Sequence, residues 1–216
     1  MAPSTQNEVI QALVSNGRAR SAAEFYAAGV NPAKLSAAVA RGRVFQWARG
    51  VYCAPEIPHG MSYAATTLLN PGGVVCLQSA ALIHCISDEN PSSIWYALDR
   101  SKTRNRPKGT NREPLTVLFW SGQSMSLGVE QMMFAGVQVN VTNPARTVVD
   151  MLRRSIRTGA IGDEQPLRAL RDFILAGGDL GDIWEVAKAF GCLDQFRPII
   201  HVAEEMRTVM TMPRRG

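Results

Sequence analysis

The first part of the chain alternates short apolar runs with glycine. Apolar residues recur at helical spacing over residues 9–14, and the run stops at Gly17, because glycine favours a left-handed helix end. Ser21 followed by Glu24 is a capping-box pattern, in which each side chain binds a free backbone amide at the start of a helix. We therefore expect a second helix after Ser21 that ends at Gly29.

A third helix and a hairpin are predicted next. Asn31 is a favoured N-cap and Pro32 suits the first helical position, so we expect a helix that ends before Gly42. The periodicity then changes from helical to alternating over residues 44–47 and 51–53, which are joined by a glycine turn typical of a hairpin. Three helices and a basic hairpin predict a winged helix-turn-helix, whose third helix enters the DNA major groove while the hairpin, or wing, follows the backbone or minor groove.

The rest of the chain predicts a mixed α+β body. Pro55 and Pro58 mark a linker, so we expect a DNA-binding domain at 1–55 and a second domain at 60–216. The expected helices are 63–69, 77–86, 144–154, 164–176, 180–190 and 196–210, and the expected strands are 94–98, 115–120 and 137–141. This order predicts an α+β fold with a small sheet and C-terminal helices.

Positive charge is concentrated in the predicted DNA-binding domain. The net charge of the 216 residues is +5, of which residues 1–55 carry +4 from six bases and two acids. Nucleic acid is the leading partner for such a module, and the alternatives are a solvated surface or docking to another protein. The predicted DNA contacts lie at the start of the second helix, on the third helix and on the wing: Arg18, Arg20, Ser21, Asn31, Lys34, Ser36, Arg41, Arg43 and Arg49.

A second basic segment lies in the body. Six bases occur among turn residues between Arg100 and Arg112. The segment is either a solvated hairpin tip or a second nucleic-acid contact made by Arg100, Lys102, Arg104, Arg106 and Lys108.

Residue spacing argues against an enzyme. The four cysteines are scattered and the three histidines fall in no zinc-binding arrangement, so we expect no metal, no other cofactor and reduced thiols. Carboxylates and lysines do not cluster as metal-dependent phosphodiester cleavage requires, and GxGxxG, GxxxxGK and GxSxG motifs are absent, so we expect no catalytic residues. No apolar stretch approaches the roughly 20 residues that cross a bilayer, and no signal-peptide pattern occurs. We expect a cytoplasmic protein without a membrane partner.

Three segments together resemble a known family. They are GRARSAAEFYAAGVNPAKLSAAVARGRVFQWARGVYCAP, LQSAALIHCIS and VNVTNPARTVVDML, and they resemble the AbiEi-type antitoxins of bacterial and phage-defence loci. The resemblance implies a winged-helix domain that binds promoter repeats in double-stranded DNA and represses its own operon. It also implies a C-terminal domain that counters a nucleotidyltransferase-like toxin, as in type IV systems, without a stable toxin complex.

In the third segment, three residues match the family motif, but the resemblance does not assign them a chemical role. By motif match these are Arg146, Thr147 and Asp150. From the residues alone, Arg146 and Asp150 lie four apart on one helix face, and we interpret them as a structural pair that depends on burial for any strong effect. Two alternative functions remain open: a nuclease targeted by a winged helix, and a transcriptional regulator that binds a small-molecule effector in its body.

Overall fold

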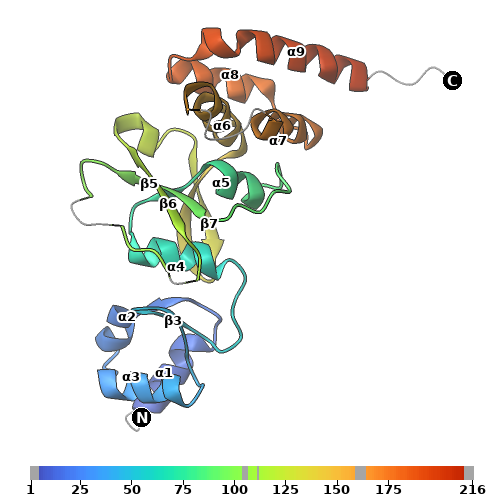
Figure 1. Cartoon of the computed structure of the whole chain (residues 1–216). Coiled ribbons are helices and arrows are strands. Elements are labelled where there is room, and N and C mark those ends of the chain that lie inside the picture. Colours follow the sequence, from blue (N-terminus) through green and yellow to red (C-terminus); the bar gives the residue numbers. More distant parts are fainter. Residues whose placement is uncertain (1–4, 104–106, 111, 159–163, 212–216) are drawn as a thin grey trace, which may run out of the picture. The chain divides into compact units, whose positions relative to one another are not determined.

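The chain forms two compact units. The computed structural model describes residues 5–103, 107–110, 112–158 and 164–211 (Figure 1). Unit 1 comprises Met1–Val75, Ser92–Ser121 and Gln131–Asn140, and unit 2 comprises Cys76–Pro91, Gly122–Glu130 and Val141–Gly216. These bounds differ from the expected domains at 1–55 and 60–216, and that division stays a prediction.

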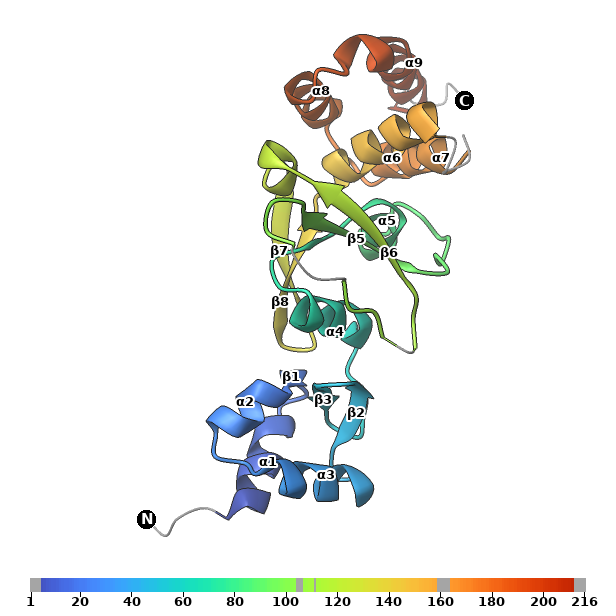
Figure 2. The same ribbon diagram turned by 60° about the vertical axis from the view of Figure 1, so that its left-hand side comes forward.

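Unit 1 begins with helices and a hairpin in the predicted order (Figure 2). Helices α1 (Gln6–Val14), α2 (Ala22–Ala27) and α3 (Pro32–Ala40) precede strands β2 (Phe45–Ala48) and β3 (Val51–Cys53). An unexpected two-residue strand, β1 (Arg20–Ser21), pairs with the other side of β3, which gives an antiparallel sheet of order β1-β3-β2. The buried core of this N-terminal module, residues 6–53, includes the cluster Ile10, Val14, Phe25, Val30, Leu35, Ala38 and Val44.

Side-chain caps determine where the three helices begin. Ser21 and Glu24 form the predicted capping box at α2, and the Asn31 side chain accepts a hydrogen bond from the backbone amide two residues ahead at α3. Thr5 and Glu8 form a further capping box at α1, which was not predicted. Each cap satisfies backbone amides that have no partner within the helix.

A five-stranded sheet follows, with strand order β6-β5-β4-β8-β7. Its strands are β4 (Val74–Val75), β5 (Ile94–Asp99), β6 (Leu115–Trp120), β7 (Val129–Phe134) and β8 (Val137–Thr142). Strand β5 pairs antiparallel with β4 and parallel with β6. Strands β5, β6 and β8 lie at their predicted positions, whereas β4 and β7 were not predicted. The mixed α+β fold class is confirmed.

The turn between β7 and β8 contacts the N-terminal module within unit 1. Ala135 and Gly136 both have positive φ angles, of 44° and 68°. The backbone amide of Ala19 donates a hydrogen bond to the Ala135 carbonyl at 2.7 Å. A Cβ added to Gly136 would lie 2.7 Å from Cγ of Arg18. The aliphatic part of the Arg18 side chain therefore leaves room only for glycine at this position. The turn therefore anchors the segment between α1 and β1.

Helix α4 (Met61–Leu69) belongs to unit 1. The described helices of unit 2 are α5 (Leu77–Ile83), α6 (Pro144–Thr158), α7 (Glu164–Leu175), α8 (Leu180–Ala189) and α9 (Leu193–Thr211). A short 3-10 helix, η1 (Gly122–Met125), precedes β7. Helix α6 contacts α5, α7 and α8, and α8 also contacts α9. Within the described ranges, no helix combines the length and apolar character that crossing a membrane requires.

Candidate nucleic-acid interface

Four cations of the N-terminal module lie on α3 and around the hairpin. Lys34 belongs to α3, Arg41 is its C-cap, Arg43 lies before β2, and Arg49 lies in the turn between β2 and β3. All four side chains are exposed, and none of them forms an ion pair with another residue that the structure describes. Their charge is therefore available to a polyanion.

The outward face of α3 is lined by small side chains. Leu35 and Ala38 are buried in the module core, whereas Ala33, Ser36 and Ala40 are exposed. Small side chains allow close approach to a DNA groove, and alanine methyl groups can contact thymine methyl groups. Asn31 is exposed at the start of the helix, but its Oδ1 accepts the capping hydrogen bond at 2.8 Å. The Asn31 Nδ2 group and the side chains of Lys34, Ser36 and Arg41 are the polar groups of this face that remain for base contacts.

Three other predicted contacts form a network within the module. Arg20 is 15% exposed, and it donates from Nε to the Leu13 carbonyl at 3.2 Å and from Nη1 to Oε1 of Glu24 at 3.1 Å. Arg18 lies 3.4 Å from the same carboxylate oxygen, and the Ser21 hydroxyl donates to the other oxygen. The network joins the end of α1 to the start of α2. Arg20 and Ser21 therefore have structural partners, while Arg18 remains 42% exposed.

The Glu24 carboxylate at the centre of this network has a lowered pKa. Desolvation, the largest single influence, raises this pKa, but hydrogen bonds from the Ser21 amide, Arg20 and the Ser21 hydroxyl, together with the charge of Arg18, outweigh it. The module thus holds Glu24 in its charged form, paired with Arg18 and Arg20.

The second basic segment divides into parts with different surroundings. Lys102 pairs with Asp99 at 3.6 Å, and Arg100 lies 6.0 Å from the centre of the Phe119 ring. Lys108 is exposed and, together with Arg49, lines a hollow of about 620 Å³. Arg104 and Arg106 are outside the described residues. The structure therefore brings one predicted residue of this segment to the hairpin turn.

Arg112 is a candidate contact that the sequence analysis did not assign. Its guanidinium lies 4.8 Å from the ring centre of Phe45 and 5.1 Å from that of Trp47, both on β2. Arg112, Trp47 and Arg49 line a second hollow of about 550 Å³. The sequence contained one signal for this contact: an arginine in the basic segment, which could lie over the two aromatic residues of the predicted wing.

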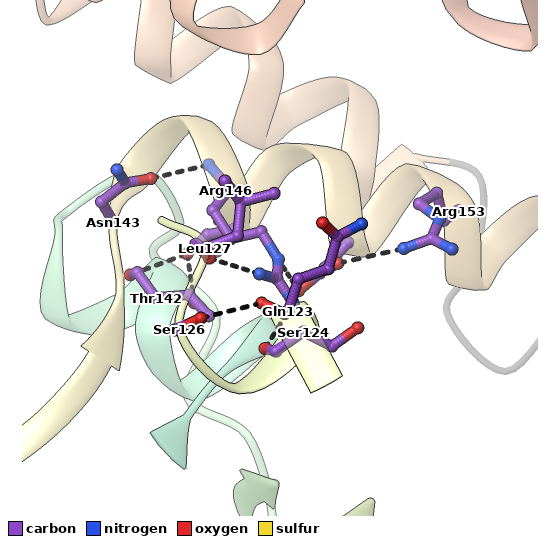
Figure 3. Close-up of polar contacts among 10 residues, drawn as sticks. Gln123, Ser124, Ser126, Leu127, Thr142, Asn143, Arg146 and Arg153 are labelled. Atoms are coloured by element: carbon purple, nitrogen blue, oxygen red, sulfur yellow. Dashed lines mark hydrogen bonds and ion pairs between the residues drawn. The ribbon is translucent and has the colours of Figure 1, made fainter. Parts of the chain in front are cut away.

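Arg146 occupies a separate, buried position in unit 2 (Figure 3). Its side chain is 1% exposed, and Nε donates to Oδ2 of Asp150 at 2.7 Å. Nη1 donates to the Leu127 carbonyl, and Nη2 donates to the Ser124 carbonyl at 3.2 Å. The guanidinium thus clamps the η1 segment to α6. Thr147 is also buried, and its hydroxyl is hydrogen-bonded to Thr142.

Two arginines lie beside Asp150 and over the Phe190 ring. Arg146 and Arg153 lie 4.3 Å and 4.6 Å from the centre of the Phe190 ring, and Arg153 lies 3.8 Å from Oδ1 of Asp150. Burial raises the pKa of the Asp150 carboxyl, against the lowering effect of Arg146 and then of Arg153. The charged groups of this cluster therefore bind one another.

An apolar groove of about 730 Å³ lies between α7 and α9 in unit 2. Leu167, Ile174 and Val202 are among its lining residues, and Leu167 and Val202 are 50% and 54% exposed. Arg168 and Arg171 provide charged groups beside it. The volume and the apolar lining are typical of a small-molecule site.

Over the residues that the structure describes, no three histidine, cysteine or acidic side chains gather closely enough to hold a metal ion. No protein-family model matches the chain, and no curated protein matches it.

Proposed function

We propose that the chain is a double-stranded DNA-binding repressor whose N-terminal module acts as a winged helix-turn-helix. The observation that carries this proposal is the set of four exposed cations without ion pairs, Lys34, Arg41, Arg43 and Arg49, on α3 and the hairpin. They flank an alanine-rich helix face that suits a major groove. Repression follows if the bound module occupies a promoter and excludes RNA polymerase.

The four cations have different roles in this proposal. Arg43 and Arg49 bind backbone phosphates around the hairpin, and Arg49 suits a narrow minor groove. Lys34 and Arg41 lie on the helix that enters the major groove, where each can bind guanine. With so few polar groups on α3, DNA shape contributes a large share of the specificity.

The resemblance to AbiEi-type antitoxins extends the proposal to a second activity. The chain would counter a nucleotidyltransferase-like toxin without a stable complex, using the part of the chain that follows the N-terminal module. Co-expression with the toxin tests this extension. An Arg49→Ala variant should lose repression of a promoter reporter and still rescue growth, and a folded variant that loses both would contradict a division of labour between the two parts.

Equilibrium binding of the full chain to its promoter duplex at several salt concentrations tests the proposal. The logarithm of the binding constant should fall steeply with the logarithm of the salt concentration, with a slope of about −0.9 per phosphate contact. Lys34→Ala should change the preferred site in a selection from random duplexes, by about 1–3 kcal/mol at the contacted base pair. Arg197→Ala on α9 removes an exposed arginine outside the proposed interface and serves as the control. A flat salt dependence for the unaltered chain would refute the proposal.

The apolar groove favours one alternative, a repressor regulated by an apolar effector. An apolar fluorescent dye such as anilinonaphthalene sulfonate is a suitable probe for the groove between α7 and α9. Val202→Glu, at a half-exposed position on the groove, should abolish the fluorescence increase while leaving the unfolding midpoint unchanged. Equal dye binding by the variant and the unaltered chain would exclude this groove as the effector site.

A further inference from the structure

We infer that the hairpin turn, together with Lys108 and Arg112, forms a second phosphate site, which holds the DNA backbone beyond the contacts of α3. This inference rests on the proposed function and deepens it. The site lies within unit 1, and the residues that carry it are Arg49, Lys108 and Arg112. It adds to the N-terminal module two cations that come from distant positions in the sequence.

Lys108 is held in place by its backbone. The Asn70 side chain, 8% exposed at the end of α4, accepts a hydrogen bond from the Lys108 amide at 2.8 Å and donates one to the Lys108 carbonyl at 2.8 Å. The Asn70 amide group also donates to the Thr66 carbonyl within α4. This arrangement fixes where the Lys108 side chain leaves the backbone, so little backbone entropy is lost when the ammonium binds an anion.

Arg112 is held in place by two rings. Its guanidinium lies over both Phe45 and Trp47, whose ring centres are 6.5 Å apart on β2. Stacking on aromatic faces leaves the edge of a guanidinium, where its N–H donors point, free for a phosphate. Arg112 is exposed despite these contacts.

Arg49 connects the two hollows. The hollow of about 620 Å³ is lined by Arg49, Lys108 and neighbouring residues, and the hollow of about 550 Å³ is lined by Arg49, Arg112 and residues of β2. No acidic residue of the described chain lines either hollow. Three cations around adjoining concave surfaces, without a compensating carboxylate, make a site for a polyanion.

The geometry favours a DNA backbone over a small free anion. Arg49 lies at the hairpin turn, which in a winged helix-turn-helix follows the backbone, so the same strand that contacts the hairpin would pass Lys108 and Arg112. A lone phosphate would bind one hollow, whereas a strand supplies successive phosphates to both. Lys108 and Arg112 would therefore lengthen the footprint of the wing.

The test compares salt dependence in the full chain. Lys108→Ala and Arg112→Ala should each reduce the magnitude of the salt slope for duplex binding by about 0.9, because each removes one phosphate contact. Arg112→Lys should retain the slope of the unaltered chain, since it keeps the charge. Arg197→Ala is the matched control, because Arg197 also lies over an aromatic ring, 5.7 Å from the centre of Trp184, and should leave the slope unchanged. Unfolding midpoints identify any variant that fails to fold.

The outcomes separate the inference from the proposed function. Steep salt dependence in the unaltered chain, with unchanged slopes for Lys108→Ala and Arg112→Ala, overturns the inference and leaves the repressor proposal intact. A slope that falls equally for Arg112→Lys and Arg112→Ala shows that the positive charge at this position does not itself determine the slope, and overturns its part in the site. Tight binding of inorganic phosphate alone, without an effect of these variants on duplex binding, overturns DNA as the ligand. No salt-dependent binding by the unaltered chain refutes both proposals.

Discussion

Replacement of Arg146 by methionine is the sharpest test of how unit 2 is held together. Methionine replaces the aliphatic part of the arginine side chain with an unbranched apolar one, but it is shorter and removes every hydrogen-bond donor of the guanidinium. The change leaves Asp150, 7% exposed, without the partner that lies 2.7 Å away. The Leu127 and Ser124 carbonyls also lose their donors.

The cost of this change is dominated by the carboxylate. Removal of one partner from a buried ion pair costs about 3–5 kcal/mol, because the remaining charge stays buried without compensation. The two carbonyls belong to half-buried residues that water can reach, so they add little. The free energy of unfolding of a domain is about 5–15 kcal/mol, so Arg146→Met should leave unit 2 marginally stable.

The cost should depend on pH with a definite sign. Burial raises the pKa of Asp150 above its ordinary value of 3.8, and loss of Arg146 removes the main influence that lowers it. The folded state then binds the proton more tightly than the unfolded state does. The stability of Arg146→Met should therefore increase as the pH falls through the raised pKa, and the gain should be complete near pH 3.8.

Urea unfolding of the full chain, followed by circular dichroism and tryptophan fluorescence, measures these effects. Arg153→Met is the control, because Arg153 is 27% exposed and lies 3.8 Å from Asp150, and it should cost less than about 1 kcal/mol. The double variant Arg146→Met/Asp150→Leu should recover most of the loss, since no charge remains buried. A loss below about 1 kcal/mol for Arg146→Met, or no recovery in the double variant, would refute the clamp. Loss of toxin rescue at unchanged stability would instead assign the pair a direct functional role.

Three further predictions concern other parts of the chain. Because the pKa of Glu24 is lowered, its contribution to stability is complete above about pH 4.5 and is lost as the pH falls below that value, so thermal unfolding of Glu24→Gln should lack this acid-dependent loss. Gly177→Ala, at a φ of 85° with open space around it, should cost about 1–2 kcal/mol in urea unfolding. Gly128→Ala should cost more, because its new Cβ would lie 2.8 Å from Cβ of Arg146, and equal costs would contradict this close approach. Of the four cysteines, only Cys85 is exposed, so a thiol reagent should titrate one group in the native chain and all four in denaturant.

Local chemistry made the N-terminal module predictable. Capping by Ser21 and Asn31 depends on residues two or three positions away, so the sequence contains the whole interaction. The ion pair of Arg20 with Glu24 could also have been predicted from the sequence, because Glu24 follows Arg20 at the four-residue spacing of a helical ion pair. A count of net charge does not show that Arg20 is already paired with Glu24 and is not available to bind DNA.

Interactions between distant segments were not predictable in this way. Strand β7 escaped prediction because its turn places Ala135 at a positive φ, where asparagine or aspartate is the usual signal. Strand β4 has two residues and no periodicity. The position of Lys108 beside the hairpin turn depends on Asn70, which no local pattern connects to it. For Arg146 and Asp150, spacing predicted the pair, but only the fold shows that it is buried.

The division of the chain into interleaved units has a consequence for synthesis. Strand β4 belongs to the first segment of unit 1, yet its neighbours in the sheet, β5 and β8, belong to later segments. A ribosome that adds about 5–20 residues per second needs on the order of ten seconds to proceed from β4 to the end of β8. During this interval the nascent chain carries an incomplete sheet, and chaperones that bind unpaired strands have time to act on it. Synonymous codons that slow elongation between β4 and β8 should therefore lower the yield of folded protein more than the same codons placed after α6.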